Sequence, residues 1–415
     1  MYKKMILIPV VLLLTITAGA NNISVSNLSK AVTNTADNYI LLQFTLSWEN
    51  SWRDAVNHDA AWVFIKYRIS GTTGAWAHAT LNYINGSNDG HTIPAGAAIR
   101  TPPDGKGVFV YRNAPGSGNT SFANIQLRWN YGADGVNDND LTDVSVSAIE
   151  MVYVPQGAFW LGDGSNIPLH GQFENGVSGL PVQITSENAL TLGGGAPGSI
   201  GNNNRTGMAN NGLSSLPPFS IDDFNDVLAQ TLPAAFPKGF NAFYCMKYEI
   251  TQGQYTDFLN KLSPAQFASR YDAFNYNSNH GGFTQTRYNI TGTHPNMTTI
   301  TPELPAVYVE WYDAAAYADW AALRPITEME FEKACRGTAA PVSGEYAWGT
   351  ATINTNSYFP ILNAGQTNEA AGGGYSTTVG NAWYDQTRAF DAAVRVGIFA
   401  AHPSNTNRVT AGATY

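Results

Sequence analysis

The stretch Ile40–Trp48 reads ILLQFTLSW, and its apolar residues alternate with the others along most of its length. All the even positions are apolar: Ile40, Leu42, Phe44, Leu46 and Trp48. Among the odd positions, only Leu41 is apolar. Successive side chains of a strand point to opposite faces. The pattern therefore predicts an antiparallel strand with one face in a core and the other in water.

The same alternation recurs through the first third of the chain. Ile125–Tyr131 (IQLRWNY) alternates as clearly, and Val108–Tyr111 is a short apolar run. A further set of alternating positions comprises Val63, Ile65, Tyr67 and Ile69. Roughly six to eight such strands, separated by Gly, Asn and Asp turns, predict a β-sandwich over residues 21–148.

The first twenty residues have the composition of an export signal. Lys3 and Lys4 form a basic start, Met5–Ile16 is apolar, and Ala18 and Ala20 fit a signal peptidase site. The apolar run is shorter than the ~20 residues that a membrane-spanning helix needs. We therefore expect cleavage near Ala20 and a secreted, periplasmic or cell-surface protein without a membrane span.

The composition limits the classes of partner. Charged residues make up only 13% of the chain, about half the usual share. The formal net charge is −9, and removal of Lys3 and Lys4 would make it more negative. Such a surface repels phosphate backbones, so we expect no nucleic-acid partner.

The predicted sandwich contains no convincing chemical site. His58, His78 and His91 lack the spacing of metal ligands. The segment 134–140 (DGVNDND) is rich in oxygen ligands and could hold calcium, but it lacks the glycine and distal glutamate of an EF-hand loop. We interpret it as an acidic turn.

A second domain is predicted over residues 149–415. Residues 144–150 run directly into Met151–Gly162 (MVYVPQGAFWLG), and without a linker the two domains are expected to pack together. The long polar segment at about 163–238 is predicted to be a partly ordered surface insertion.

Three helices are predicted in the second domain. A strand over 243–250 precedes a helix that begins at Thr251 with a capping box to Gln254. The apolar residues of this helix follow the helical period: Tyr255, Phe258, Leu259 and Leu262. A second, alanine-rich helix is predicted over Trp311–Leu323.

The third helix lies in Arg324–Gly337, which reads RPITEMEFEKACRG. Thr327 and Glu330 form a capping box, Ile326 is positioned to pack on Phe331, and Gly337 follows the last turn. Cys335, in that turn, is interpreted as a small apolar scaffold residue.

Four blocks occur in an order that resembles a known family. They are MVYVPQGAFWLG, FYCMKYEITQGQYTDFLN, LPAVYVEWYDAAAYADWAALRPITEMEFEKACRG and EYAWG. Together they resemble the formylglycine-generating enzymes, or sulfatase-modifying factors, over about residues 150–349. Arg324–Glu328 matches the family's R-[LP]-P-T-E core. The resemblance implies a variant of the C-type-lectin fold, so the expected fold class is mainly β plus α+β.

Family members use different metals or none. The name-giving enzymes oxidise a sulfatase cysteine with copper held by two cysteines, relatives use iron and three histidines, and others only bind ligands. In the family, a block with a G-N-x-W-E motif comes next, followed by R-G-G-S-W and a terminal G-F-R. This closing third holds the catalytic cysteines and much of the metal site. Here Gly380–Trp383 (GNAW) lacks the glutamate, and no RGG or GFR occurs before Tyr415. The predicted domain is therefore incomplete at its C-terminus.

No residue is predicted to be catalytic or to bind a cofactor. Cys245 and Cys335 show no pattern that would bring them together, and whether they form a disulfide is left open. His280, His294 and His402 have no spacing that would build an iron site. No cofactor is predicted, although relatives use copper or calcium, and the metal content stays open.

Three functions agree with these features. The first is an exported, non-catalytic protein for ligand binding or surface display, with an unknown protein or glycan ligand. The alternative is an incomplete chain of a formylglycine-generating oxidase that acts on sulfatase cysteines. The third is a structural component of a fibre or wall, favoured by the low charge and the sandwich.

Overall fold

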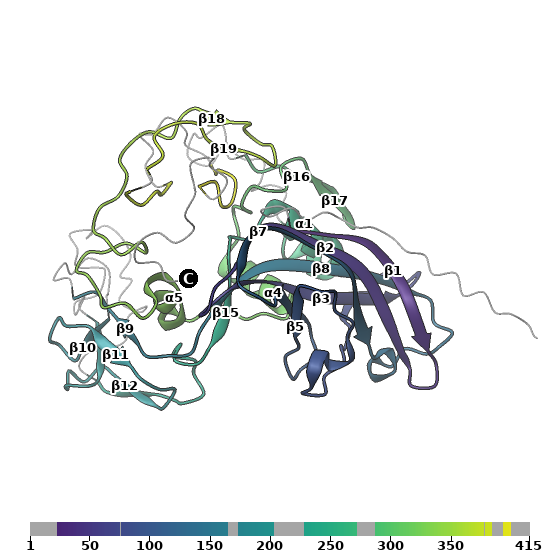
Figure 1. Cartoon of the computed structure of the whole chain (residues 1–415), viewed down its shortest axis with the longest axis horizontal. Coiled ribbons are helices and arrows are strands. Elements are labelled where there is room, and N and C mark those ends of the chain that lie inside the picture. Colours follow the sequence, from purple (N-terminus) through teal and green to yellow (C-terminus); the bar gives the residue numbers. More distant parts are fainter. Residues whose placement is uncertain are drawn as a thin grey trace, which may run out of the picture.

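The computed structural model describes residues 23–74, 76–164, 173–202, 228–271, 287–376, 378–383 and 393–399. Within these ranges the chain is mainly β with a few short helices, as expected (Figure 1). The export signal predicted in residues 1–20 lies outside them. In the described part, no helix has the length and apolar character needed to cross a membrane.

Eight strands form the N-terminal part. They are β1 (Ser24–Asn34), β2 (Tyr39–Arg53), β3 (Asp59–Ile69), β4 (Ala77–His78), β5 (Ala97–Arg100), β6 (Val108–Arg112), β7 (Gly116–Trp129) and β8 (Thr142–Val154). Two 3₁₀ turns accompany them, η1 (Ser87–Gly90) and η2 (Tyr131–Asp134).

The remaining elements are short. The strands are β9 (Phe159–Leu161), β10 (Phe173–Asn175), β11 (Val182–Ile184), β12 (Leu190–Leu192), β13 (Ile200–Asn202), β14 (Gln230–Leu232), β15 (Phe243–Met246), β16 (Ile290–Thr293), β17 (Asn296–Thr299), β18 (Ile361–Leu362) and β19 (Ala370–Ala371). The helices are α1 (Gln252–Lys261), α2 (Pro264–Ala268), α4 (Trp311–Trp320) and α5 (Glu328–Arg336).

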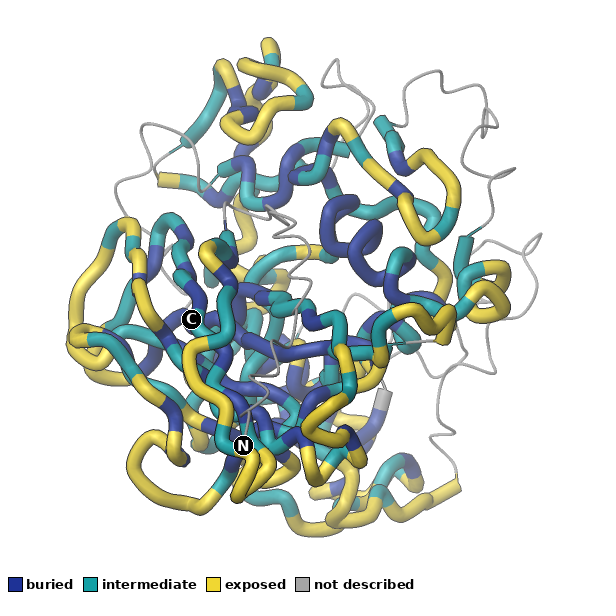
Figure 2. The backbone as a smooth tube through the Cα atoms, turned by 90° about the vertical axis from the view of Figure 1, so that its right-hand side faces the viewer, coloured by how far each residue is buried: buried dark blue, intermediate teal, exposed yellow. Residues whose placement is uncertain are grey.

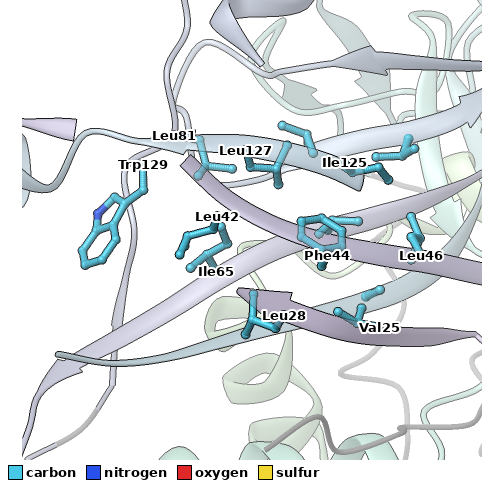
Figure 3. Close-up of a cluster of buried hydrophobic side chains, with 14 of the residues drawn as sticks. Val25, Leu28, Leu42, Phe44, Leu46, Ile65, Leu81, Ile125, Leu127 and Trp129 are labelled. Atoms are coloured by element: carbon cyan, nitrogen blue, oxygen red, sulfur yellow. The ribbon is translucent and has the colours of Figure 1, made fainter. Parts of the chain in front are cut away.

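The predicted β-sandwich is confirmed. One sheet has the order β1-β2-β7, and the central sheet has the order β15-β8-β3-β6-β5 with β4 paired to β3. The even positions of Ile40–Trp48 are all buried between the sheets, together with Ile125, Leu127 and Trp129 of β7 (Figure 3). Alternation thus identified the inner faces of β2 and β7.

The two halves of the chain share the central sheet. β8 continues from Thr142 to Val154, past the boundary that we placed after Ala148. β15 then pairs antiparallel with β8, with Phe243 opposite Val154 and Met246 opposite Met151. One hydrogen-bonded ladder therefore connects the sandwich to the part that follows.

The prediction that β3 has one wet face is wrong for most of the strand. All residues from Asp59 to Lys66 are buried. The side chains on the sandwich side join its core, whereas Trp62 and Phe64 point to the opposite face and pack with helices α1 and α4. The Trp62 indole donates a hydrogen bond to the carbonyl of Ala321 (2.8 Å). The helices form a third layer, and a strand covered on both faces loses its wet positions.

The capping boxes are confirmed in the helices where we predicted them. Thr251 and Gln254 cap α1, and Thr327 and Glu330 cap α5. Tyr255, Phe258 and Leu259 of α1 are buried, as the period predicted. α4 begins at the predicted residue, but it ends at Trp320 rather than Leu323 (Figure 1).

The described part of the polar insertion is ordered. It contains the small sheet β10-β13-β12-β14 and the strand β11, which pairs with β9. Ile184 and Ile200 share a third core with Phe159, Leu161 and Met329 of α5. Figure 2 shows buried backbone running through the sheets and helices, whereas the outer turns are exposed. Residues 165–172 and 203–227 of the insertion lie outside the described ranges.

Candidate ligand-binding groove

The sequence block around α5 has a structural role. Arg324 donates two hydrogen bonds to the buried carboxylate of Glu330 (2.7 and 2.5 Å), which also accepts from the amide of Thr327 (3.1 Å). The ammonium of Lys333 donates to the carbonyls of Pro155 (2.7 Å) and Gly239 (2.6 Å). These contacts fix α5 against the ends of β8 and β15. The packing of Ile326 on Phe331 is not seen, and both side chains are exposed.

Both cysteines are free and partly buried. The pKa of Cys245 is raised to about 11, chiefly by burial and to a smaller extent by Cys335 and Glu330. The pKa of Cys335 is also raised, first by burial and then by Glu332. A protonated thiol is a poor nucleophile.

The three histidines of the sandwich occupy separate places. His91 is buried, and its Nδ1 accepts a hydrogen bond from the amide of Arg128 (3.0 Å). His78 is on β4, whereas His58 lies before β3. Of the other candidate ligands, His294 contacts the carbonyl of Leu262 (3.0 Å). His280 and His402 are outside the described residues. Where the structure is described, no three His, Cys, Asp or Glu side chains form a group that could hold a metal ion.

The acidic segment 134–140 is held by protein donors. Asp134 accepts hydrogen bonds from the amide of Thr80 (2.8 Å) and the indole of Trp129 (2.6 Å). Asp138 accepts from the hydroxyl of Tyr131 (2.5 Å). These contacts give the segment a role in closing the end of the sandwich.

A groove opens where β15 joins the sandwich. It consists of two adjoining pockets of about 230 and 390 Å³, which share Arg100, Tyr153 and Tyr244 as lining residues. The smaller pocket is bordered by the loop 53–58, and the larger one by Phe109 and the segment 101–103. Preformed pockets of this size that combine aromatic and polar walls are typical of ligand sites.

Strand register places the lining side chains on one face of the central sheet. Tyr244 lies opposite Tyr153, and Arg100 lies opposite Phe109, which lies opposite Trp62. Directly opposed residues of antiparallel strands point to the same side. This is the face that α1 and α4 cover elsewhere, yet no residue of either helix lines the groove. The groove is therefore the part of this face beyond the helical layer.

Aromatic rings form a stacked platform in the groove. The imidazole of His58 lies between Tyr111 (ring centroids 4.4 Å apart) and Tyr153 (4.9 Å), both in stacked orientation. The Tyr244 ring stacks on Phe109 at 3.7 Å, and its hydroxyl lies 3.2 Å from Nε2 of His58. Rings fixed by so many neighbours present a rigid apolar surface.

His58 is neutral at physiological pH. Its pKa is lowered to about 4, chiefly by burial and also by the positive charge of Arg53, although Asp59 and Asp54 oppose the shift. The imidazole is thus an uncharged ring, held between Tyr111 and Tyr153 with its Nε2 at the hydroxyl of Tyr244. We had set His58 aside as an isolated histidine. Its role depends on Tyr111, Tyr153 and Tyr244, whose approach becomes visible only once the strands are paired.

The family match lies within the second half of the chain. Residues 215–392 match the family described as the sulfatase-modifying factor enzyme 1-like domain. The match begins after MVYVPQGAFWLG and extends past EYAWG through Gly380–Trp383, the segment that lacks the glutamate of the family's G-N-x-W-E motif. Of the groove residues, Tyr244 lies inside the matched range, whereas Tyr153 and Arg100 precede it.

Three curated proteins illustrate the similarity. The formylglycine-generating enzyme of Streptomyces coelicolor is 52% identical over 48 residues, which are 12% of this chain and 15% of that protein. That of Thermomonospora curvata is 47% identical over 51 residues, 12% of this chain and 16% of that protein. The hercynine oxygenase of Mycobacterium tuberculosis is 39% identical over 71 residues, 17% of this chain and 15% of that protein.

The matched segments thus span about one sixth of the length of these relatives. No solved structure matches the chain. The family match and the formylglycine-generating relatives agree on one assignment. Residues 215–392 are thus similar to the sulfatase-modifying factor family of the formylglycine-generating enzymes.

Proposed function

We propose that this is an exported ligand-binding protein whose family domain is non-catalytic and completes a glycan-binding groove. The observation that carries the proposal is the stacked platform of His58, Tyr111, Tyr153 and Tyr244. Sugar rings have flat apolar faces edged by hydroxyl groups. Such a face can pack on aromatic rings while its hydroxyls bond to the polar groups at the rim.

The position of the groove supports binding rather than internal packing. It lies where a strand of the family domain, β15, extends the sheet of the sandwich. Tyr153 and Tyr244 retain partial exposure, although their rings are 5.2 Å apart. A site built across two parts of a chain is a common location for ligands.

The cysteines support a non-catalytic family domain. A cysteine acts as nucleophile or soft metal ligand in its thiolate form. The raised pKa of both Cys245 and Cys335 keeps them protonated near neutral pH. They are accordingly proposed to be scaffold residues, and copper chemistry at this pair is not part of the proposed function.

A binding assay with single-residue variants tests the proposal. The purified chain is titrated by calorimetry with oligosaccharides of matched length, and Tyr153→Ala is compared with Tyr153→Phe. We expect the alanine variant to lose binding at least about tenfold, whereas the phenylalanine variant keeps the ring and most of the affinity. If no oligosaccharide binds, or if removing the ring changes nothing, the proposed function is wrong.

Export is proposed from the first twenty residues. Ala18 and Ala20 precede a predicted cleavage point, so the exported protein should begin near Asn21. N-terminal sequencing of protein recovered from the periplasm, medium or cell surface tests this. Recovery of exported protein that still begins at Met1 would refute the cleavage.

The family match favours an alternative, a formylglycine-generating oxidase acting on sulfatase cysteines. The test is incubation of the chain with copper and a cysteine-containing sulfatase peptide, followed by mass spectrometry. The proposed function predicts no aldehyde. Conversion that disappears in Cys245→Ser or Cys335→Ser would support the oxidase instead.

A further inference from the structure

We propose that the groove selects acidic glycans, in which a carboxylate or sulfate ester of the sugar pairs with Arg100 and Arg53. The inference rests on the proposed glycan binding and adds the charge of the ligand. Both guanidinium groups lie at the stacked platform, so one sugar residue could contact the rings and the cations together.

Arg100 is the more accessible cation. It lines both pockets of the groove, and its side chain is exposed. In the register of β5 and β6 it lies opposite Phe109, on the groove side of the sheet. No carboxylate among the described residues forms an ion pair with it. A guanidinium presents several N–H groups in a planar fork that fits the two oxygens of a carboxylate.

Arg53 is fixed in place beside the platform. Its Nη1 donates a hydrogen bond to the carbonyl of Arg112 (2.7 Å), and its guanidinium carbon lies 5.2 Å from the centroid of the Tyr111 ring. These contacts use only part of its donor capacity. A guanidinium held in position loses little freedom when it binds an anion.

The acidic residues of the groove are already engaged by backbone amides. Asp54 accepts hydrogen bonds from the amides of Val56 (2.7 Å) and Asn57 (2.8 Å). Asp89, which is buried, accepts from the amides of Ile84 (3.1 Å) and Gly86 (3.2 Å). Asp89 is buried, whereas Asp54 is exposed and keeps its charge at the rim beside Arg53. Arg100 is therefore the exposed cation of the groove that no described carboxylate pairs with.

The net negative charge of the chain makes an exposed cation in the groove informative. With a formal net charge of −9, the molecule repels anions over most of its surface. An acidic ligand would therefore be bound only where cations are concentrated. A groove for neutral sugars would gain nothing from the exposed guanidinium of Arg100 on such a surface.

Calorimetry of the full chain with three probes tests the proposal. The probes are oligomers of equal length made of galacturonic acid, of neutral galactose and of sulfated galactose. We expect the acidic probes to bind at least about tenfold more tightly than the neutral one, and the advantage to shrink as salt is added. The two acidic probes separate carboxylate from sulfate as the preferred group.

Two variants of Arg100 and one control sharpen the test. Arg100→Gln should remove most of the preference for the acidic probes, and Arg100→Lys should keep part of it because the charge remains. Arg68→Gln makes the same charge change at the other end of the sheet, where Arg68 pairs with Asp143, and should leave the preference unchanged.

The outcomes separate this inference from the proposed function. Equal binding of neutral and acidic probes, or an unchanged preference in Arg100→Gln, would overturn the acidic selectivity and leave glycan binding intact. The absence of binding by all three probes would overturn both. Circular dichroism first establishes that the Arg100→Gln variant is folded, so that a change in its preference can be assigned to the missing guanidinium.

Discussion

Tyr153 of β8 lies directly opposite Tyr244 of β15, and the centroids of their rings are 5.2 Å apart. Tyr153 precedes the segment that matches the sulfatase-modifying factor family, whereas Tyr244 lies within it. The pairing therefore assembles one wall of the groove from both parts of the chain. A consequence is that the groove requires the junction between sandwich and family domain to be intact, so the proposed ligand binding should depend on the stability of this junction.

The first prediction concerns the core that joins the two parts. Phe64 is fully buried, and it meets Trp320 of α4 edge to face with centroids 5.1 Å apart. Phe64→Ala should lower the free energy of unfolding by about 3–5 kcal/mol, because it removes a large side chain from a packed core. Urea denaturation followed by tryptophan fluorescence and by far-ultraviolet circular dichroism measures the loss.

The same experiment tests whether the halves unfold together. Because β3, β8, α1 and α4 contribute to one core, both signals should report a single transition. Phe331→Ala is the control, since this exposed residue of α5 should cost no more than about 0.5 kcal/mol. Two separate transitions, with the sandwich unaffected by Phe64→Ala, would contradict a shared core.

The sequence predicted those features that are set by local periodicity. The alternation in Ile40–Trp48 identified a strand and its buried face, and the capping boxes at Thr251 and Thr327 identified helix starts. Each depends on residues within a few positions of one another. Such patterns can be interpreted before the chain is folded.

Features that depend on contacts between residues far apart in the sequence could not be predicted from it. The apolar run of β3 was interpreted as an alternating strand, because its second buried face exists only once α1 and α4 pack on it. The glycine-rich insertion lacked strand signals, yet its short strands are ordered by a core shared with Met329. His58 and Tyr244 are far apart in sequence, and no spacing rule connects them. His58 stacks on Tyr153 of β8, and the pairing of β8 with β15 places Tyr244 opposite Tyr153.

The second prediction concerns the start of α5. Thr327→Ala should destabilise the protein by about 1 kcal/mol through loss of the helix cap. Glu330→Ala should cost about 2–3 kcal/mol, because the buried carboxylate also binds Arg324. The double variant should lose less than the sum of the two, since the side chains form one box. Strictly additive losses in urea denaturation would show that the box contributes nothing, and the exposed Glu328→Ala serves as control.

The third prediction concerns the thiols. With the pKa of Cys245 raised to about 11 by burial, little thiolate is present at pH 8. Iodoacetamide should therefore alkylate Cys245 in the native protein about 100-fold more slowly than a cysteine in a short peptide, and denaturant should abolish the difference. The raised pKa of Cys335 predicts slow labelling there too. If mass spectrometry shows that Cys245 of the native protein is alkylated as fast as the peptide cysteine, the thiol is reactive and the scaffold role is contradicted.

The last prediction concerns Glu150, which is buried on β8. Its Oε2 and the Oδ2 of Asp59 each lie 3.1 Å from the ammonium of Lys247. Its Oε1 has no hydrogen-bond partner among the described residues. The pKa of Glu150 is raised to about 8, chiefly by burial; Lys247 opposes the rise, and Asp59 and Glu303 contribute to it. One lysine shared between two carboxylates compensates only part of the burial of Glu150, so its pKa stays above the usual range.

A raised pKa makes stability depend on pH in a definite direction. Between the pKa of an unfolded glutamate, about 4.3, and the folded value of about 8, only the folded protein keeps this proton. The contribution of Glu150 is thus fully favourable below about pH 4 and is lost as the pH rises to about 8. Glu150→Gln should reduce the loss of unfolding free energy between pH 5 and pH 9, because glutamine stays neutral and its carbonyl can still accept from Lys247. The exposed Glu249→Gln should keep the full loss. An unchanged pH profile in Glu150→Gln would mean that Glu150 is ionised in the folded protein and that Lys247 balances both carboxylates.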